Sequence, residues 1–130
     1  MPDGTAATAD PATAMLICQA ITAARSVLRY TTERQLQDAL DAVLAVNGYD
    51  YQREVHLGPV DRPDFTVGPI VIEVKVKGTA DQLTRQIRRY MGHDQVGAVI
   101  VVTRCARHRD IPDQIDGKPV YLVWLSGLLG

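Results

Sequence analysis

Alternation of apolar and charged side chains is clearest between residues 70 and 77. Ile70, Ile72, Val74 and Val76 alternate with Val71, Glu73, Lys75 and Lys77. A period of two is typical of a β-strand with one buried face. We therefore expect Glu73 and Lys75 to be neighbours on the other, solvated face of this strand.

A second short strand is expected just upstream, at residues 64–67. Pro63 cannot donate to a sheet ladder and suits the first residue of a strand or an edge. Gly68 and Pro69 form a tight link to the next strand. The pattern predicts an antiparallel hairpin in which Asp64 lies across from Glu73.

A helix is expected from about Glu33 to Asn47. Thr32 and Gln35 have the spacing of a capping box, and Asn47-Gly48 is a natural stop. The helical spacing places the Glu33 carboxylate on the interior face, with the apolar residues Leu36, Leu40, Val43 and Leu44. Acidic residues are also common in a first helical turn because of the helix dipole, so Glu33 has an ordinary explanation too.

Two more helices follow from the same periodicity. Residues 79–92 bury Leu83, Ile87 and Met91, and a polar stripe flanks that face, with Gln86 and Tyr90 on its border. Asp10-Pro11 resembles an N-cap followed by proline at the first helical position, which predicts a helix to about Arg29. Its apolar stripe is expected to pack on the core or on another subunit; it comprises Ile17, Ile21, Ala24 and Leu28.

Two Val-rich runs, at residues 98–103 and 120–125, are typical of strands buried on both faces. The strand-helix-strand order around residues 79–103 predicts an α/β fold with a mixed central sheet flanked by helices. A chain of 130 residues suits one such domain, here residues 10–130. Residues 1–9 contain little to bury, so we expect them to be disordered.

Composition makes the residue 70–77 strand unusual. Arg outnumbers Lys eleven to three and Asp outnumbers Glu twelve to three, yet this strand holds two of the Lys and one of the Glu. A Lys ammonium is a compact charge whose pKa shifts readily, which suits it to hold or deprotonate a water near a metal. The ordinary alternative is a solvated strand face with a cross-strand ion pair.

Basic residues concentrate in the second half of the chain. The net charge of −1 argues against a general nucleic-acid coat, but residues 79–109 hold six Arg against two Asp, a local charge of +4. That stretch could form a phosphate track, because phosphate contacts depend on Arg and Lys. The candidates are Arg85, Arg88, Arg89, Arg104, Arg107 and Arg109. Alternatively, the last three form a soluble loop and pair with Asp110, Asp113 and Asp116.

The two cysteines, Cys18 and Cys105, have no metal-like spacing. Nothing in the sequence resembles a signal peptide or an apolar span of about 20 residues. We therefore expect a cytoplasmic protein with free thiols and no membrane association.

Residues 31–103 resemble the PD-(D/E)XK nuclease superfamily, the restriction-endonuclease-like fold. The resemblance rests on the order of a helix with a Glu, a strand, a strand with Pro63-Asp64, a strand with Glu73-Val74-Lys75, a helix and a strand. Gln86-Ile-Arg-Arg-Tyr90 also resembles the Gln-x-x-x-Tyr motif of the RecB-like and lambda-exonuclease-like branch. That branch usually carries a further His ahead of Pro-Asp, and His56 matches it only loosely.

The resemblance implies an αβββαβ core and hydrolysis of phosphodiester bonds in nucleic acid, DNA in the first place. It implies that Asp64, Glu73 and the backbone carbonyl of Val74 bind Mg²⁺ or Mn²⁺. Lys75 would position or activate the attacking water. Glu33 would match the helical acid of the family, and Gln86 and Tyr90 would orient the lysine or the substrate phosphate.

Three alternative functions remain open, two of them nucleases and one non-enzymatic. Holliday-junction resolvases of similar size suggest, by analogy of fold, a homodimer that cleaves four-way junctions. A restriction or defence nuclease would instead read a short duplex sequence. In a non-enzymatic reading the fold serves as a nucleic-acid-binding or interaction module, against which the intact Asp64, Glu73 and Lys75 argue. The sequence decides neither DNA against RNA nor endonuclease against exonuclease.

Overall fold

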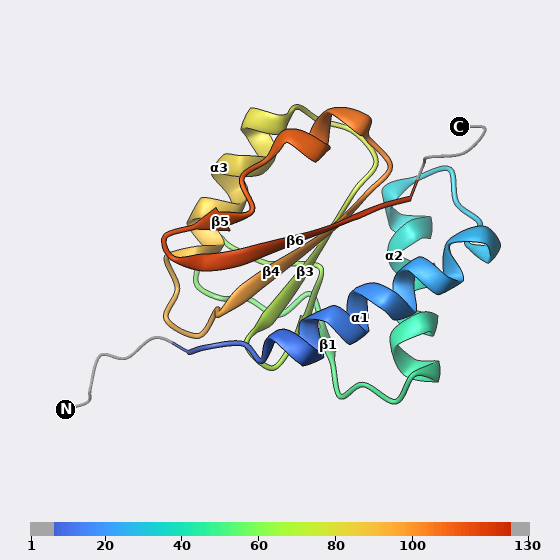
Figure 1. Cartoon of the computed structure of the whole chain (residues 1–130), viewed down its shortest axis with the longest axis horizontal. Coiled ribbons are helices and arrows are strands. Elements are labelled where there is room, and N and C mark those ends of the chain that lie inside the picture. The colour runs from blue at the N-terminus through green and yellow to red at the C-terminus, as the bar shows by residue number, and fades with distance from the viewer. Residues whose placement is uncertain (1–6, 126–130) are drawn as a thin grey trace.

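The computed structural model describes residues 7–125, which form a small α/β domain (Figure 1). Its α-helices are α1 (Pro11–Ala24), α2 (Glu33–Val46) and α3 (Ala80–Met91). Short 3-10 segments cover Arg25–Val27 and Ala106–Asp110. The strands are β1 (Gln52–Arg53), β2 (Phe65–Val67), β3 (Ile70–Lys75), β4 (Ala98–Thr103), β5 (Gln114–Ile115) and β6 (Lys118–Trp124).

One mixed sheet contains all six strands of the described residues, in the order β1-β2-β3-β4-β6-β5. β1, β2 and β3 pair antiparallel, β3, β4 and β6 pair parallel, and β5 returns antiparallel on β6. The predicted mixed α/β fold is confirmed. The segment from α2 to β4 has the order αβββαβ. Its first strand, β1, is the one for which no residue range was predicted from the sequence.

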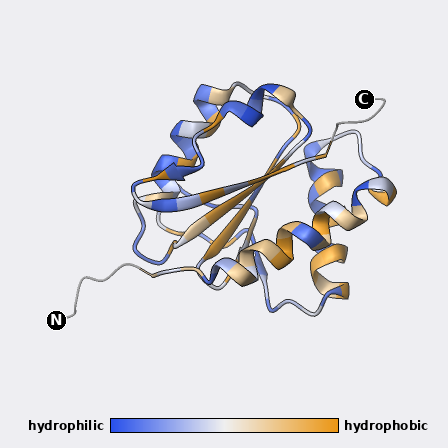
Figure 2. Cartoon of the chain, in the orientation of Figure 1, coloured by the Kyte–Doolittle hydropathy of each residue, from blue (hydrophilic) through white to orange (hydrophobic). Residues whose placement is uncertain are grey.

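The two central parallel strands are covered on both faces. α1 and α2 pack on one face, where Ile72 and Ile100 belong to the same core cluster as Ile17. α3 packs on the other face, where Ile87 and Tyr90 join Val71 in a second cluster. Figure 2 shows the apolar strands running between these helices. The expectation that Glu73 faces solvent is therefore wrong, because parallel strands with a crossover helix are covered on both sides. Lys75 and Lys77, toward the end of that face, keep some exposure.

Side-chain caps define where α2 and α3 begin. Thr32 and Gln35 form the expected capping box at α2, and Thr79 and Gln82 form another at α3. α1 is shorter than predicted, ending at Ala24 rather than near Arg29. Its last turn tightens to a 3-10 turn, and Leu28 then adopts an extended backbone that lets its side chain pack against the core.

Two further expectations need correction. Residues 7–9 are not disordered: the Ala7 N–H donates to the Asp94 carbonyl at 2.7 Å, and Ala9 packs against the core. Gly97 permits this approach, because a Cβ there would lie 2.7 Å from the Ala9 nitrogen. Residues 1–6 lie outside the described part of the chain. β6 is only partly buried, since just the two-residue β5 lies beyond it.

None of the helices within residues 7–125 is long and apolar enough to cross a membrane.

Candidate functional site

Asp64 and Glu73 meet where the β2–β3 hairpin opens. The register pairs Phe65 with Ile72, so the preceding residue, Asp64, lies across from Glu73 as predicted. The Asp64 N–H donates to Glu73 Oε1 at 3.3 Å, and Asp64 Oδ2 accepts from the Val74 N–H at 2.7 Å. The hairpin backbone therefore holds both carboxylates in one place.

Glu73 is 3% exposed and surrounded by partners from β3 and α3. The Tyr90 hydroxyl donates to Oε1 at 3.1 Å, and Lys75 Nζ lies 3.4 Å from Oε2. Gln86 in turn donates to the Tyr90 hydroxyl at 3.0 Å. The pair that resembles the Gln-x-x-x-Tyr motif thus contacts Glu73 directly through Tyr90 and indirectly through Gln86.

The start of α2 closes the site from the opposite side. Gln37 Nε2 donates to Asp64 Oδ1 at 2.9 Å, and Glu33 Oε1 accepts from the Val76 N–H at 3.3 Å. Residues four apart on a helix share a face, so Glu33 and Gln37 approach the end of β3 together. The predicted inward orientation of Glu33 is confirmed, although the carboxylate remains only half-buried.

These side chains line one polar pocket of about 430 Å³. It brings together four of the side chains predicted for a catalytic centre, Glu33, Asp64, Glu73 and Lys75, with Gln86 as a fifth. Gln37, Arg34, Glu54 and Arg62 complete the wall. Four elements that are distant in sequence therefore converge on one small acidic volume.

Burial changes the acidity of both central carboxylates. Burial, followed by the neighbouring Glu73 charge, raises the pKa of Asp64 to about 7, against the lowering effect of the Val74 N–H. The pKa of Glu73 is also raised, first by burial, and Lys75 opposes that rise. One ammonium does not balance two buried carboxylates, so the pair retains a proton near neutral pH.

The donor set fits a hard divalent cation. A bound cation would offset the burial that raises both pKa values and the Glu73 charge that adds to the rise at Asp64. Carboxylate oxygens are also the ligands that Mg²⁺ and Mn²⁺ prefer. Within residues 7–125, no three or more His, Cys, Asp or Glu side chains are grouped so that they could hold a metal ion. Mg²⁺ often binds through one or two carboxylates and keeps several waters, so Asp64 and Glu73 suffice for that mode.

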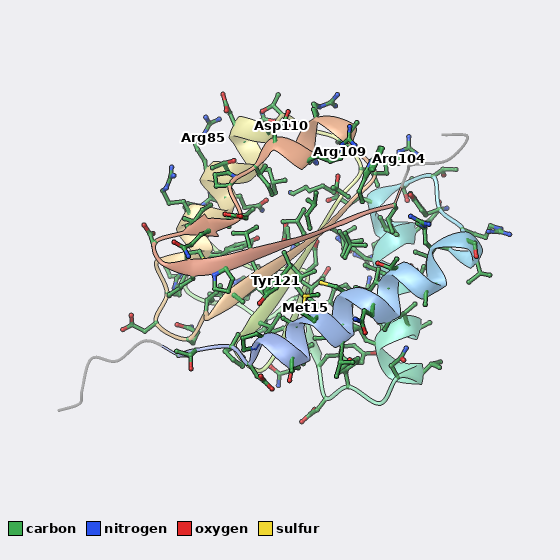
Figure 3. All side chains as sticks on the ribbon, in the orientation of Figure 1. Met15, Arg85, Arg104, Arg109, Asp110 and Tyr121 are labelled. Atoms are coloured by element: carbon green, nitrogen blue, oxygen red, sulfur yellow. The ribbon has the colours of Figure 1, made fainter. Side chains whose placement is uncertain are left out.

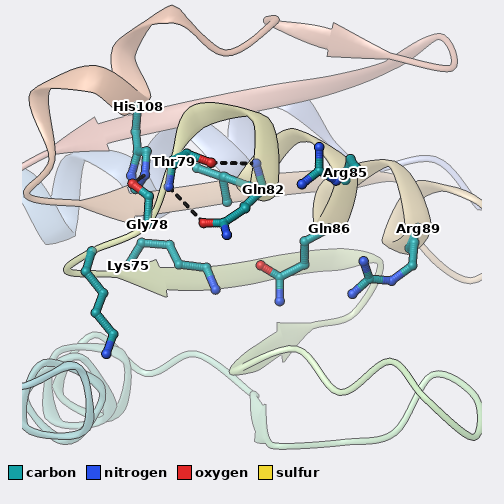
Figure 4. Close-up of a pocket in the computed structure, with 10 residues that line it drawn as sticks. Lys75, Gly78, Thr79, Gln82, Arg85, Gln86, Arg89 and His108 are labelled. Atoms are coloured by element: carbon teal, nitrogen blue, oxygen red, sulfur yellow. Dashed lines mark hydrogen bonds between the residues drawn. The ribbon is translucent and has the colours of Figure 1, made fainter.

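The predicted basic residues divide into two groups. Lys75, Arg85 and Arg89 line a neighbouring cleft of about 360 Å³, where Figure 4 shows Lys75 and Gln86 extending toward each other. Arg89 is committed to Asp61: its Nε lies 3.0 Å from Asp61 Oδ1, and His93 contacts the other oxygen at 2.8 Å. That ion-pair cluster holds the loop before β2 against α3.

The structure does not bring Arg104 and Arg109 to this cleft. Arg109 stacks over the Trp124 ring at 4.0 Å, and Figure 3 shows both residues well apart from Arg85. Arg107 approaches more closely, because its Nε donates to the Gly78 carbonyl at 2.7 Å. Within residues 7–125, none of the three forms the alternative ion pairs with Asp110, Asp113 or Asp116. His56 is exposed and borders a different pocket.

Four residues of the acidic pocket were not predicted from the sequence: Arg34, Gln37, Glu54 and Arg62. Gln37 lies one turn after Glu33, a spacing that could have indicated it. Arg62 directly precedes Pro63-Asp64, but nothing in the sequence distinguishes it from other surface Arg. Glu54 has a left-handed backbone (φ 58°), which is rare for this residue type and not visible in a sequence pattern.

Comparison of the chain with protein-family models, curated proteins and solved structures finds no match.

Proposed function

We propose that the chain is a divalent-metal-dependent nuclease that hydrolyses phosphodiester bonds of nucleic acid, DNA in the first place. One observation carries this proposal: Asp64, Glu73 and Lys75 converge in a single pocket, with both carboxylates largely removed from water. Buried like charges destabilise a fold, so they are rare where no function requires them. Carboxylates with shifted pKa values in a cleft are typical of active sites. The resemblance to PD-(D/E)XK nucleases supports the same chemistry.

In this proposal each side chain has a distinct role. Asp64 and Glu73, with the carbonyl of Val74, hold Mg²⁺ or Mn²⁺. Lys75, whose side chain is 21% exposed, sits between Glu73 and the open cleft, where it can orient a water or take its proton. Tyr90 fixes Glu73 by its hydroxyl, and burial beside Glu73 raises the pKa of Tyr90 so that it remains a donor.

A bound divalent cation would polarise the phosphate and neutralise charge that develops during in-line displacement. Gln37 and the Val74 N–H orient Asp64 for that role through their hydrogen bonds. Glu33 accepts from the Val76 N–H just beyond β3, and in this proposal it positions that end of the strand.

A resolvase-like homodimer is a second candidate with one observation in its favour. α1 carries no charged residue, and its Met15 and Leu16 are 48% and 57% exposed. An uncharged helix face of this kind suits contact with a second copy. Sedimentation of the purified protein, with Leu16→Glu as the comparison, tests it: a wild-type monomer contradicts the homodimer.

A substrate panel tests the nuclease proposal. Linear duplex, single strand, circular single strand, RNA and four-way junctions are incubated with Mg²⁺, with Mn²⁺ or with EDTA. We expect metal-dependent cleavage of at least one substrate by the wild type and none by Glu73→Gln. Binding of these substrates without cleavage under any metal condition would instead favour the non-enzymatic module. Cleavage of circular single strands would establish endonuclease action.

A further inference from the structure

A second concave surface adjoins the acidic pocket and differs from it in charge. Its cations are Lys75, Lys77, Arg85 and Arg89, and its neutral lining includes Thr79 and His108. The lining contains four cationic side chains and no carboxylate. Lys75 and Gln86 line both hollows, so the cleft and the acidic pocket are adjacent.

Two of these cations already have partners. Lys75 pairs with Glu73, and Arg89 pairs with Asp61. Lys77 and Arg85 are exposed and form no ion pair with any described residue. Both residues line the cleft, Lys77 from the turn after β3 and Arg85 from α3.

The neutral groups of the wall are occupied by the fold itself. Thr79 and Gln82 satisfy each other in the α3 capping box, as the dashed lines in Figure 4 show. His108 is fully buried and holds the Gly78 carbonyl at 3.0 Å, beside Arg107. The wall is therefore pre-formed, and the groups left free to bind a ligand are the cations.

We infer that this cleft binds a backbone phosphate of the nucleic acid, next to the phosphate at Asp64 and Glu73, with Lys77 and Arg85 as its ligands. The inference rests on the proposed function and adds to it a site for the neighbouring phosphate. A polyanion suits the arrangement: one phosphate reaches the carboxylates, which repel it unless a cation is bound, while the next is held by uncompensated charge. Anchoring a neighbouring phosphate fixes the register of the strand.

Binding in EDTA tests the cleft without cleavage. The double variant Lys77→Gln/Arg85→Gln is compared with Arg25→Gln/Arg29→Gln, which removes the same charge from exposed positions outside the cleft. The nucleic acid of the substrate panel that the wild type binds most tightly is labelled with a fluorophore. Its affinity for each protein is measured by anisotropy over a series of salt concentrations. Melting temperatures check that both variants are folded.

We expect the cleft variant to bind on the order of tenfold more weakly, with the slope of log affinity against log salt shallower by about 0.7 to 0.9 per lost contact. The control variant keeps a slope near that of the wild type. Wild-type affinity and slope in the cleft variant, an equal loss in the control variant, or no nucleic-acid binding by the wild type would each overturn the inference.

Cleavage assays separate this inference from the proposed nuclease function. A wild type that cleaves, together with a cleft variant that binds normally, refutes the cleft and leaves the nuclease proposal intact. A wild type that never cleaves but binds through Lys77 and Arg85 refutes the nuclease proposal and keeps the cleft. If the protein is a nuclease and the cleft also binds the neighbouring phosphate, the cleft variant shows a raised KM and a kcat near that of the wild type. The lost contact is one that the substrate makes equally in the ground state and in the transition state.

Discussion

The backbone N–H of Asp64 donates to Oε1 of Glu73, so the two acids are linked by the main chain as well as by their shared surroundings. The same Asp64 accepts from the Val74 N–H, one residue beyond Glu73. This reciprocal contact makes their separation a property of the hairpin rather than of flexible side chains. A site built on paired strands can hold two like charges at a defined spacing.

Substitution of Lys75 tests whether this side chain takes part in the chemical step of cleavage. We expect Lys75→Ala to lose cleavage by several orders of magnitude in kcat while it binds metal and nucleic acid nearly as the wild type does. Lys75→Arg should not restore activity, because a guanidinium is larger and does not give up its proton. Single-turnover assays and Mn²⁺ titration provide the two measurements. Robust turnover by Lys75→Arg would reduce Lys75 to a generic positive charge.

Asp64 links stability to pH in the metal-free protein. Its pKa is 3.8 ordinarily and about 7 in the fold, so the folded state keeps a proton that the unfolded chain has released. The resulting stability is complete below pH 3.8 and is lost as the pH rises through about 7. Melting in EDTA should therefore show the wild type losing stability over that window, and Asp64→Asn losing less.

Metal should reverse that loss. A cation that binds only the folded state raises the melting temperature by mass action, and it binds best when both carboxylates are ionised. Mn²⁺ should stabilise the wild type more at pH values above about 7 than below it, and stabilise Asp64→Asn little. Equal stabilisation of the two proteins would contradict the metal assignment.

The hairpin and its carboxylates were predictable because local rules define them. A period of two and a Gly-Pro link determine the strand register, and the register places Asp64 across from Glu73. The capping residues located the start of α2 to the residue. Gln86 was predicted at the edge of the apolar face of α3 and is half-buried there, whereas Tyr90, predicted beside it at that edge, is fully buried in the core cluster.

Other features depend on contacts between distant segments. Arg89 looked available for phosphate because its partner Asp61 is separated from it by 28 residues. Gln37 reaches Asp64 across 27 residues, and only the packed sheet brings them together. The alternation in β3 predicted a solvated face, but α3 covers that face and leaves Glu73 buried. Conflict between a polar residue and a buried position is itself typical of functional sites.

Tyr90 should influence activity through Glu73 alone. Tyr90→Phe keeps the buried ring but removes the hydroxyl that donates to Glu73, a loss of about 1 to 2 kcal/mol in the free energy of unfolding. That hydrogen bond lowers the pKa of Glu73, so its removal raises the pKa further. We expect the acid limb of the pH–rate profile to move to higher pH. An unshifted profile with reduced stability would make Tyr90 purely structural.

Gln86→Ala provides a comparison at a residue that reaches Glu73 only through Tyr90. Gln86 supports the Tyr90 hydroxyl and does not contact Glu73. We expect slower turnover, a smaller shift of the profile than in Tyr90→Phe and an unchanged salt slope for binding. A changed slope would indicate that Gln86 contacts the nucleic acid instead.

His108 should make the turn beside the cleft sensitive to acid. The Gly78 carbonyl can only accept, so His108 Nε2 carries the proton, and neutral Nδ1 accepts from the Thr103 hydroxyl at 2.7 Å. Thr103 Oγ1 meanwhile accepts from the Cys105 N–H. A second proton on the ring would face a hydroxyl that no longer has an acceptor to donate to, and burial lowers the pKa of His108 accordingly.

The sign of the effect follows from that lowered pKa. The unfolded chain takes up the proton near 6.5, whereas the folded protein resists it until a lower pH. The contribution is therefore present above pH 6.5 and is lost as the pH falls below it. Denaturant melts should show a steeper acid loss in the wild type than in His108→Gln, whose amide can still donate to Gly78. His56→Gln, at an exposed histidine, should follow the wild type, and a parallel acid loss in all three proteins would exclude His108 as the source.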